Sequence, residues 1–264
     1  MNSGLTELLD SAVSAAVSGK DVAVAFSGGL DSGLLAHMAG EHARSAVLYT
    51  VGTPGSYDVI ASEDMASRLD MDWRLIELTD DLALDSLRES VAVTGTVDPI
   101  VLSFETPLAC VLRSCCEDTV VTGQGADEVF AGYSKYLGLS LGEFREKQSE
   151  DMAKLHDVTL VHEGLMARRY GRSTVYPFLD PGVVAYGASL DAEGILPRGD
   201  VRKHALRRTA EELGLPFVAC KPKKAAQYGS GAMRLFRRIS KKMGLSFNEL
   251  IIGLRNQQDC DRLQ

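Results

Sequence analysis

Short runs of apolar and β-branched residues alternate, in the first half of the chain, with longer segments whose apolar residues recur every three to four positions. The short runs predict buried strands at residues 20–26, 45–51, 73–78 and 119–122. The longer segments predict helices between these strands. Because strands that alternate with helices are joined by right-handed crossovers, we expect an α/β fold built on a parallel, doubly wound sheet.

The same periodicity predicts the helices that connect the strands. They are expected within residues 1–20, after residue 31, at residues 58–69, and from residue 80 or 81 onwards. Residues 94–105 show no regular spacing, and Asp98-Pro99 is typical of a turn. Thr106-Pro107 then predicts the start of a helix that runs to Cys116, because a proline at the first helical position loses no hydrogen bond.

The second half of the chain is predicted to be mainly helical. Helices are expected at residues 152–170 and 201–213, and a turn at residues 176–181 separates them. We therefore expect two parts. Residues 1–137 would form the α/β domain, and residues 138–264 a helical part that completes the active site.

Composition is typical of a globular protein without membrane spans. Of the 264 residues 45% are hydrophobic, which is enough for a sizeable core. No apolar stretch approaches the length of a membrane span, and residues 1–20 lack the basic start and apolar run of a signal peptide. We therefore expect a cytoplasmic protein with no membrane partner. The five cysteines show neither a Cys-x-x-Cys pair nor zinc-finger spacing, which favours structural thiols.

The chain is acidic overall but carries one basic block. Its formal net charge of −8 argues against a nucleic-acid partner. Residues 198–242 nevertheless contain thirteen basic and three acidic residues, most of which we expect on a solvated face. The lysines near Gly199 and near residues 229–231 are the exceptions, because a loop lysine that faces a phosphate site can neutralise a leaving pyrophosphate.

The turn from Ser27 to Ser32, between the first strand and the next helix, has the composition of a phosphate-binding loop. Gly28 and Gly29 lack a Cβ atom, so the backbone there can direct its N–H groups at an anion. Ser27 and Ser32 supply hydroxyl donors, and the helix start adds its positive dipole end. The sequence therefore predicts a phosphate site at the end of the first strand.

Carboxylates follow two strand ends of the predicted sheet. Asp31 would repel a bare polyphosphate, but it suits a Mg²⁺ ion that bridges phosphates. Asp127 follows the fourth strand, in a second glycine loop that contains Gly123 and Gly125. Because ligands bind at the carboxyl ends of parallel strands, we expect Asp31 and Asp127 to share a magnesium ion.

The Ser27–Ser32 segment resembles the pyrophosphate loop of the ATP pyrophosphatases, which cleave ATP between the α and β phosphates, and the Walker A pattern is absent. Four further segments, taken in order with it, resemble the synthetase domain of glutamine-hydrolysing asparagine synthetase and, more loosely, the β-lactam synthetases. They are Val51-Gly-Thr-Pro-Gly-Ser56, Thr122-Gly-Gln-Gly-Ala-Asp-Glu128 with Phe130-Ala-Gly-Tyr133, Pro177-Phe-Leu-Asp180, and Lys221-Pro-Lys-Lys224 ahead of Gly229-Ser-Gly231.

The resemblance implies an ATP-dependent, AMP-forming carbon–nitrogen ligase with an adenine-nucleotide α-hydrolase-like fold and with ATP and Mg²⁺ as cofactors. A carboxylate would attack the α-phosphate of ATP and release pyrophosphate, and ammonia or an amine would then displace AMP. The implied partners are a small carboxylate and ammonia or an amine. A separate glutaminase subunit and a homo-oligomer are further candidates.

The resemblance also implies roles for particular residues. It assigns ATP and pyrophosphate binding to Ser27, Gly28, Gly29, Asp31, Ser32, Gly123 and Gly125, with adenine recognised by the backbone of Val51 and Gly52. It places Mg²⁺ on Asp31 and Asp127. Lys203 and Lys223 would contact pyrophosphate and stabilise the charge that develops at the α-phosphate.

The chain departs from the asparagine synthetase pattern in its expected acceptor half. Asn2 stands where that family has its glutaminase cysteine, so we do not expect this chain to liberate ammonia by that route. Gln124 replaces the usual Glu of the Gly-Glu-Gly loop, which leaves open whether full activity is kept. Ser103 and residues 173–175 lack the arginines of asparagine synthetases, which disfavours aspartate as the acceptor. The histidines show no ligand spacing, so we expect them on the surface or within helices, with His162 as the one candidate for proximity to the acceptor.

Two other functions fit parts of the same sequence. An RNA-modifying ATP pyrophosphatase would use the basic block as an RNA surface, and its RNA binding would weaken steeply with salt. A nucleotide-binding regulator that has lost its chemistry would bind ATP without releasing pyrophosphate. The residues alone leave these alternatives open beside the ligase.

Overall fold

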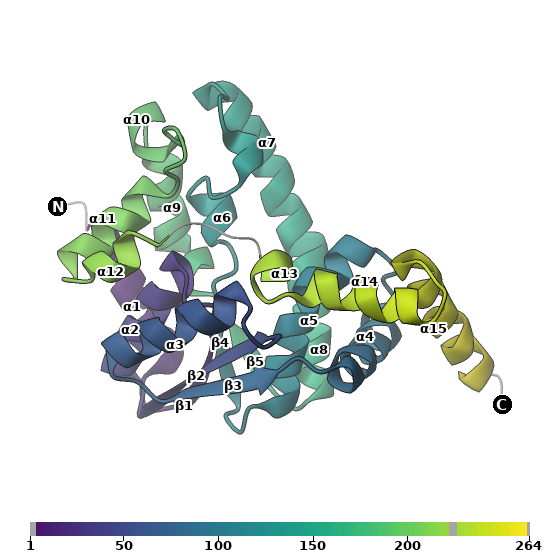
Figure 1. Cartoon of the computed structure of the whole chain (residues 1–264). Helices are drawn as coiled ribbons and strands as arrows, with labels where there is room; N and C mark the ends of the chain where they lie inside the picture. The colour runs from purple at the N-terminus through teal and green to yellow at the C-terminus, as the bar shows by residue number, and fades with distance from the viewer. Residues whose placement is uncertain (1–3, 222–225, 263–264) are drawn as a thin grey trace.

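The strand β1 (Asp21–Ala25) lies at the centre of a five-stranded parallel sheet with the order β3-β2-β1-β4-β5. The computed structural model describes residues 4–221 and 226–262 (Figure 1). The other strands are β2 (Ser45–Gly52), β3 (Trp73–Glu77), β4 (Thr119–Val121) and β5 (Ser173–Val175). All four predicted strands are confirmed.

Helices cover both faces of this sheet because successive residues of β1 point to opposite sides. Val22 and Val24 are buried with α1 (Leu5–Val17), α2 (Leu30–His42) and part of α3 (Tyr57–Leu69). Ala23 is buried on the other face. The helices packed there are α4 (Asp80–Thr94), α5 (Pro99–Ser114), α8 (Leu160–Arg169), α14 (Ala232–Lys242) and α15 (Phe247–Arg262). The predicted doubly wound α/β fold is confirmed.

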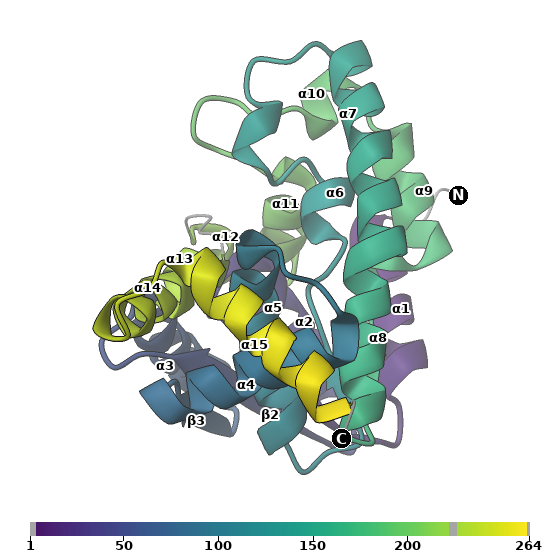
Figure 2. The same ribbon diagram turned by 90° about the vertical axis from the view of Figure 1, so that its right-hand side faces the viewer.

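The remaining helical elements lie around the carboxyl ends of the strands and beside the sheet face that α1 and α2 cover. They are α6 (Ala126–Val129), η1 (Ser134–Tyr136), α7 (Leu141–Lys154), the π-helix η2 (Leu155–Thr159), η3 (Pro177–Leu179), α9 (Pro181–Ser189), α10 (Ala192–Ile195), α11 (His204–Glu212), α12 (Pro216–Ala219) and α13 (Ala226–Gly229). Figure 2 shows that α7 and α8 form one long column along the side of the molecule.

The start of α5 corrects one prediction. The helix begins at Pro99, not at Pro107, which lies inside it. Asp98 is the N-cap, since its Oδ1 accepts hydrogen bonds from the backbone N–H groups of Ile100 (2.8 Å) and Val101 (3.2 Å). Aspartate at the N-cap and proline at the next position both favour a helix start. The helix therefore starts at this pair and not at the Thr-Pro pair eight residues later.

The strand β5 was not predicted. It consists of only three residues and pairs with β4 through Thr119 opposite Ser173 and Val121 opposite Val175. A strand this short and polar has too few apolar positions to show a period of two. Through β5, the part of the chain after residue 137 contributes to the sheet. The division into residues 1–137 and 138–264 stays a prediction.

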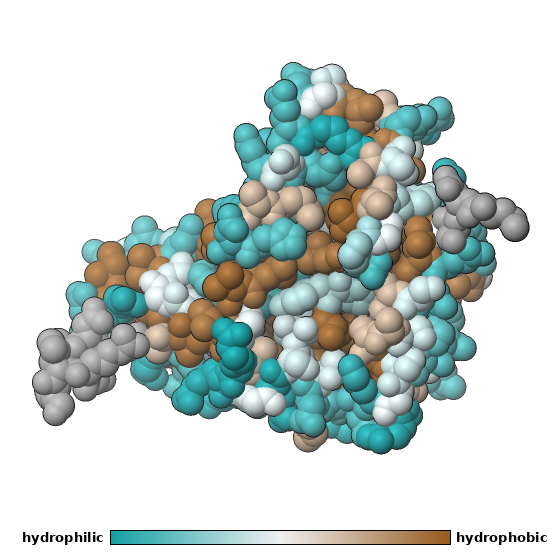
Figure 3. Space-filling model, turned by 180° about the vertical axis from the view of Figure 1, so that it is seen from behind, coloured by the Kyte–Doolittle hydropathy of each residue, from teal (hydrophilic) through white to brown (hydrophobic). Residues whose placement is uncertain are grey.

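The surface of the described chain is mixed in polarity. Seen from behind (Figure 3), apolar residues gather in a band across the middle of the molecule, with polar residues above and below. Within residues 4–221 and 226–262 no single helix is long and apolar enough to cross a membrane. The helices α4 and α5 meet that test only together, as a pair bent by 109°.

Candidate active site

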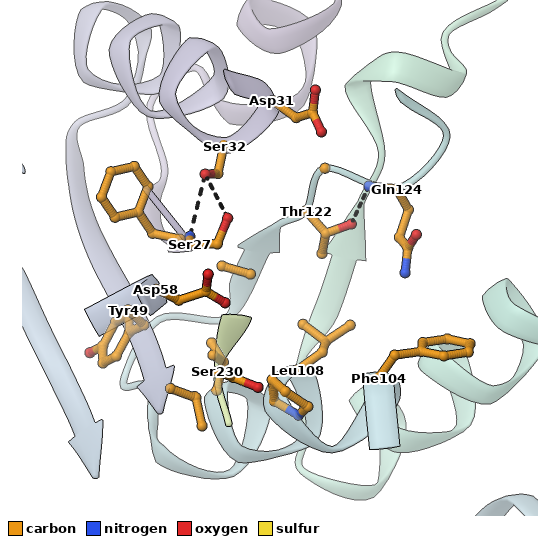
Figure 4. A pocket seen from close by; sticks show the side chains of 16 residues that line it. Ser27, Asp31, Ser32, Tyr49, Asp58, Phe104, Leu108, Thr122, Gln124 and Ser230 are labelled. Atoms are coloured by element: carbon orange, nitrogen blue, oxygen red, sulfur yellow. Dashed lines mark hydrogen bonds between the residues drawn. The ribbon is translucent and has the colours of Figure 1, made fainter. Parts of the chain in front are cut away.

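The loops that leave β1, β2 and β4 lie side by side because β1 runs between the other two strands. A cavity of about 190 Å³ opens at these strand ends (Figure 4). Its walls come from the ends of these strands, from the turns after β1 and β4, from one face of α5, and from Asp58 and Ser230. The topology therefore gathers the predicted phosphate loop, the second glycine loop and the end of β2 around one space.

The phosphate loop is held by its own hydroxyl groups. The backbone N–H of Ser27 donates to Ser32 Oγ at 3.3 Å, and the two serine hydroxyls lie 3.3 Å apart (Figure 4). Gly29 precedes α2 and has no side chain to cap it, so the first N–H groups of α2 remain available to an anion. This arrangement has the geometry of a phosphate site.

Gly28 is required for packing as well as for a phosphate to approach. Its φ is +66°, and a Cβ there would lie 2.5 Å from the backbone carbon of Ala61 and the backbone nitrogen of Ser62. The loop thus rests directly against the backbone of α3. Any other residue would push the loop and α3 apart.

Asp31 and Asp127 meet at a single ammonium group. Lys203 Nζ lies 2.6 Å from Asp31 Oδ2 and 2.6 Å from Asp127 Oδ1, so these two oxygens can be no more than twice 2.6 Å apart. Lys203 is only 2% exposed. Two predicted magnesium ligands and one predicted catalytic lysine therefore form one buried charged group.

Backbone geometry makes room for this group. Lys203 is the N-cap of α11 and has a left-handed backbone (φ 59°, ψ 47°). Gly132 lies directly against the centre, since a Cβ there would overlap both Asp127 Oδ1 and Lys203 Cε. Sequence reasoning noted Gly132 only as part of the Phe130–Tyr133 motif, because the need for a missing Cβ depends on a contact with residue 203.

The two aspartates fit a magnesium ion that also binds phosphates. Mg²⁺ is usually held by one or two carboxylates together with waters and substrate phosphates. Asp31 Oδ1 is buried and has no hydrogen-bond partner within the described part of the chain, so it can serve as a ligand. Elsewhere among the described residues, no group of three or more His, Cys, Asp or Glu could hold a metal.

The predicted nucleotide contacts divide into those that line the cavity and those beside it. Val51 and Gly123 line it. Gly52 lies beneath, where a Cβ would come within 2.6 Å of Ser56 Oγ and 2.7 Å of Val59. Gly125 is the N-cap of α6 (φ 88°) and packs against the side chain of Leu179. The predicted catalytic Lys223 lies outside the described residues.

Sequence reasoning missed two cavity-lining residues on the side of the Gly52 loop. Asp58 is in the first turn of α3, and Ser230 precedes α14 (Figure 4). The carbonyl of Ser230 accepts a hydrogen bond from the backbone N–H of Thr53 at 3.0 Å, which joins this segment to the Gly52 loop. Gly229 packs directly against the Asp58 carboxylate. The Gly-Ser-Gly motif quoted from the sequence was the available signal.

Two buried glutamates stand behind the wall formed by Gln124 and Phe104, and sequence reasoning missed both. Gln124 Nε2 donates to Glu163 Oε1 at 2.5 Å, and His162 Nδ1 lies 2.9 Å from Glu105 Oε1. Burial raises the pKa of Glu163 to about 7. Burial and then the nearby Glu163 raise the pKa of Glu105 to about 8. Phe104, the neighbour of Glu105 in α5, lines the cavity and His162 does not, so the closeness of His162 to the acceptor stays a prediction.

Comparison with known proteins decides the family. Residues 4–147, a little over half of the chain, match the asparagine synthase family. This chain belongs to that family. The predicted resemblance to asparagine synthetase is thereby confirmed.

This chain is similar to individual members of the asparagine synthase family over different lengths. The chain is 28% identical over 295 aligned positions to "Putative asparagine synthetase (glutamine-hydrolyzing) 1" of Methanocaldococcus jannaschii, covering 96% of this chain and 54% of that protein. It is 36% identical over 124 residues to "Asparagine synthetase domain-containing protein 1" of Mus musculus, covering 44% of this chain and 20% of that protein. The chain thus spans about half the length of the first relative.

Among solved structures, this chain is similar to an NMN synthetase from Francisella tularensis. The two chains are 12% identical with a TM-score of 0.46, and the match covers 96% of this chain and 92% of that one.

Proposed function

We propose that this chain is an ATP-dependent, AMP-forming ligase. A carboxylate oxygen of the acceptor attacks the α-phosphorus of ATP, the bond between the α and β phosphates breaks, and pyrophosphate leaves. The nitrogen of ammonia or another amine then attacks the acyl carbon. The acyl–oxygen bond breaks, AMP leaves, and the nitrogen loses a proton. The products are an amide, AMP and pyrophosphate.

Several groups of this chain support the first step by their position. The first N–H groups of α2 and the hydroxyls of Ser27 and Ser32 bind and orient the phosphates. Magnesium bound by Asp31 and Asp127 would offset the charge of the phosphates. Lys203, and Lys223 by the family resemblance, stabilise the pyrophosphate as it leaves. Displacement at phosphorus needs mainly positioning and positive charge, which these groups supply.

The observation that carries the proposal is the meeting of Asp31, Asp127 and Lys203 at 2.6 Å contacts beside the phosphate loop. These residues come from the ends of β1 and β4 and from the start of α11. A structural ion pair needs only two such groups. Two carboxylates and a lysine beside the phosphate loop, with Asp31 lining the cavity, fit the handling of a metal-bound polyphosphate better than simple stabilisation.

The test is to incubate the protein with ATP, Mg²⁺, ammonium and a panel of carboxylates, and to separate the nucleotides by ion-exchange chromatography. We expect AMP and pyrophosphate in equal amounts with at least one carboxylate. Release of ADP and phosphate would overturn the ligase. Binding of ATP without cleavage for any carboxylate would favour the regulator.

The variant Asp127→Asn tests the metal site. A neutral amide is a poor magnesium ligand, so we expect pyrophosphate formation to fall at least about 100-fold, equivalent to roughly 3 kcal/mol of transition-state stabilisation. Asp85→Asn is the matched control, since Asp85 is about half exposed and pairs with Arg88 on the surface. An unchanged rate in Asp127→Asn would remove Asp127 from the metal site.

A further inference from the structure

One wall of the cavity faces the place where an acceptor must lie if the proposed ligase is correct. It is formed by Gln124 and Thr122, from the loop after β4, and by Phe104 of α5 (Figure 4). Thr122 Oγ1 accepts a hydrogen bond from the backbone N–H of Gln124 at 3.4 Å. This bond fixes the base of the Gln124 side chain at the wall.

The Gln124 amide has one defined orientation. Its end that contacts Glu163 lies 2.5 Å from Oε1 of that residue. The atom at this end is Nε2, which donates to Oε1, so the NH₂ group faces Glu163. The amide oxygen is not engaged by Glu163, and Gln124 lines the cavity, so this oxygen can accept a hydrogen bond from a ligand.

The groups behind Gln124 disfavour a negatively charged ligand at this wall. Glu163 is 3% exposed, and its carboxyl group interacts with Gln124 and with the hydroxyl group of Tyr176. Glu105 is 6% exposed and already bound to His162. Burial raises the pKa of both glutamates, so these surroundings also disfavour a further carboxylate, and Glu163 would repel it when ionised.

No described residue that lines the cavity is an arginine or a lysine. The buried ammonium of Lys203 is bound to Asp31 and Asp127 on the phosphate side. A second carboxylate on the acceptor would need a cationic partner, ideally a bidentate arginine. The described part of this wall has none.

We infer that the acceptor is an amino- or amide-bearing monocarboxylic acid whose N–H group donates to Gln124 Oε1, and not a dicarboxylic acid such as aspartate. This inference rests on the proposed function, because only a ligase of this kind needs an acceptor at the wall. Glu163 acts here as a positioning residue. It fixes the orientation of Gln124 and makes the wall attractive to N–H donors.

Binding measured by calorimetry tests the inference without turnover. The protein is loaded with Mg²⁺ and α,β-methylene-ATP, which cannot be cleaved between the α and β phosphates. It is then titrated with L-aspartate, L-asparagine and L-2,3-diaminopropionate, which share one carbon skeleton and differ in the terminal group. We expect asparagine and diaminopropionate to bind at least about tenfold more tightly than aspartate, a difference of roughly 1.4 kcal/mol.

Two variants and one control assign the preference to this wall. Glu163→Gln frees the Gln124 amide to turn, and Gln124→Met removes the amide, so in each we expect the preference over aspartate to fall below about threefold. Glu150→Gln changes an exposed glutamate of α7, and this variant should keep the preference over aspartate. Binding of the ATP analogue by Glu163→Gln shows whether that variant is folded. If it is not folded, Gln124→Met provides the test.

Each outcome has a defined meaning. Tightest binding by aspartate, equal binding by all three acids, or binding by none of them at millimolar concentration overturns the inference. A preference that survives both variants overturns it as well. The ligase is judged separately, by AMP and pyrophosphate formation in the wild type, so it can stand when the inference fails.

Discussion

The absence of one Cβ atom allows the charged centre to form. Gly132 packs against both Asp127 and Lys203, and any side chain there would occupy the space that these groups need. Lys203 is also buried and Asp127 is mostly so, which leaves both groups little room to move aside. Gly132 therefore acts through sterics alone.

Replacing Gly132 by alanine should displace either the Asp127 carboxylate or the Lys203 stem. We expect the variant to lose at least about tenfold in kcat/KM for ATP, since an error of about 1 Å in a positioned group can reduce rates more than this. The measurement is initial-rate kinetics of pyrophosphate release. Gly142→Ala is the control, because a Cβ in that part of α7 meets no atom within 4 Å, and it should retain full activity. Wild-type kinetics in Gly132→Ala would show that the centre tolerates a methyl group.

Glu105 gives a prediction about pH. Burial, Glu163 and Asp98 raise its pKa from 4.5 to about 8. The folded protein therefore binds the carboxyl proton of Glu105 more tightly than the unfolded chain does. This binding stabilises the folded state fully below pH 4.5, and the stabilisation is lost as the pH rises through about 8.

Glu105→Gln removes this titration. Urea unfolding at about pH 5 and pH 9 should show the free energy of unfolding of the wild type falling relative to that of the variant as the pH rises. Glu150→Gln, on the surface, should track the wild type at both pH values. A difference between wild type and Glu105→Gln that is the same at both pH values would contradict a raised pKa at Glu105.

At this scale the sequence predicts residues that closely follow a strand end better than residues deep within a helix. Ser27, Asp31 and Asp127 follow strands, and strand ends of a parallel sheet meet at one edge, so their position follows from the pattern alone. Glu105 and Glu163 lie within helices, where a glutamate usually faces solvent. Their burial depends on α5 packing against α8, which no local pattern specifies.

At the scale of elements, α5 supplies one wall of the cavity and its start is fixed by Asp98. Phe104, Pro107, Leu108 and Val111 lie on one face of this helix and line the cavity. Pro107 within the helix lacks the N–H that would bond to residue 103. The helix therefore depends on its cap and its packing more than a regular helix does.

Asp98→Ala should lower the free energy of unfolding by about 1 kcal/mol, because two backbone N–H groups lose the carboxylate that accepts from them. Urea unfolding followed by circular dichroism measures this. The matched control is Asp118→Ala, whose side chain is 92% exposed and whose loss should leave the unfolding midpoint unchanged. Equal midpoints for the two variants would mean that Asp98 does not stabilise α5.

The elements themselves show where sequence patterns succeed. The strands β1 to β4 are apolar and flanked by clear helices, so they could be predicted. The start of α5 was misplaced because two Pro-containing starts compete within ten residues, and only tertiary packing selects between them. The strand β5 is defined by pairing with β4 and not by its own composition.

At the scale of the whole molecule, Lys203 joins segments that are distant in sequence. It lies 172 residues from Asp31, yet their side chains are in contact at 2.6 Å. Removing this cation leaves two carboxylates facing each other in a buried site, which is strongly unfavourable unless another cation enters.

Lys203→Met keeps the apolar stem but removes the charge. Without divalent ions we expect the free energy of unfolding to fall by about 3–5 kcal/mol, as for other buried ion pairs that lose one partner. Millimolar Mg²⁺ should restore stability to this variant more than it stabilises the wild type. Thermal unfolding with and without Mg²⁺ measures both effects.

Lys147→Met is the matched control, because Lys147 pairs with Glu150 on the surface of α7. It should show neither the loss of stability nor the added response to Mg²⁺. An equal magnesium response in Lys203→Met and wild type would mean that the two aspartates do not bind the ion together.

The distance in sequence between Asp31 and Lys203 has a consequence for biosynthesis. A ribosome completes both aspartates and most of the sheet well before it reaches the lysine that neutralises them. A nascent chain that ends near residue 147 would contain both aspartates and the segment that matches the family, but not the ammonium group that lies between them. Under the proposed function, such a chain would not yet carry the complete site.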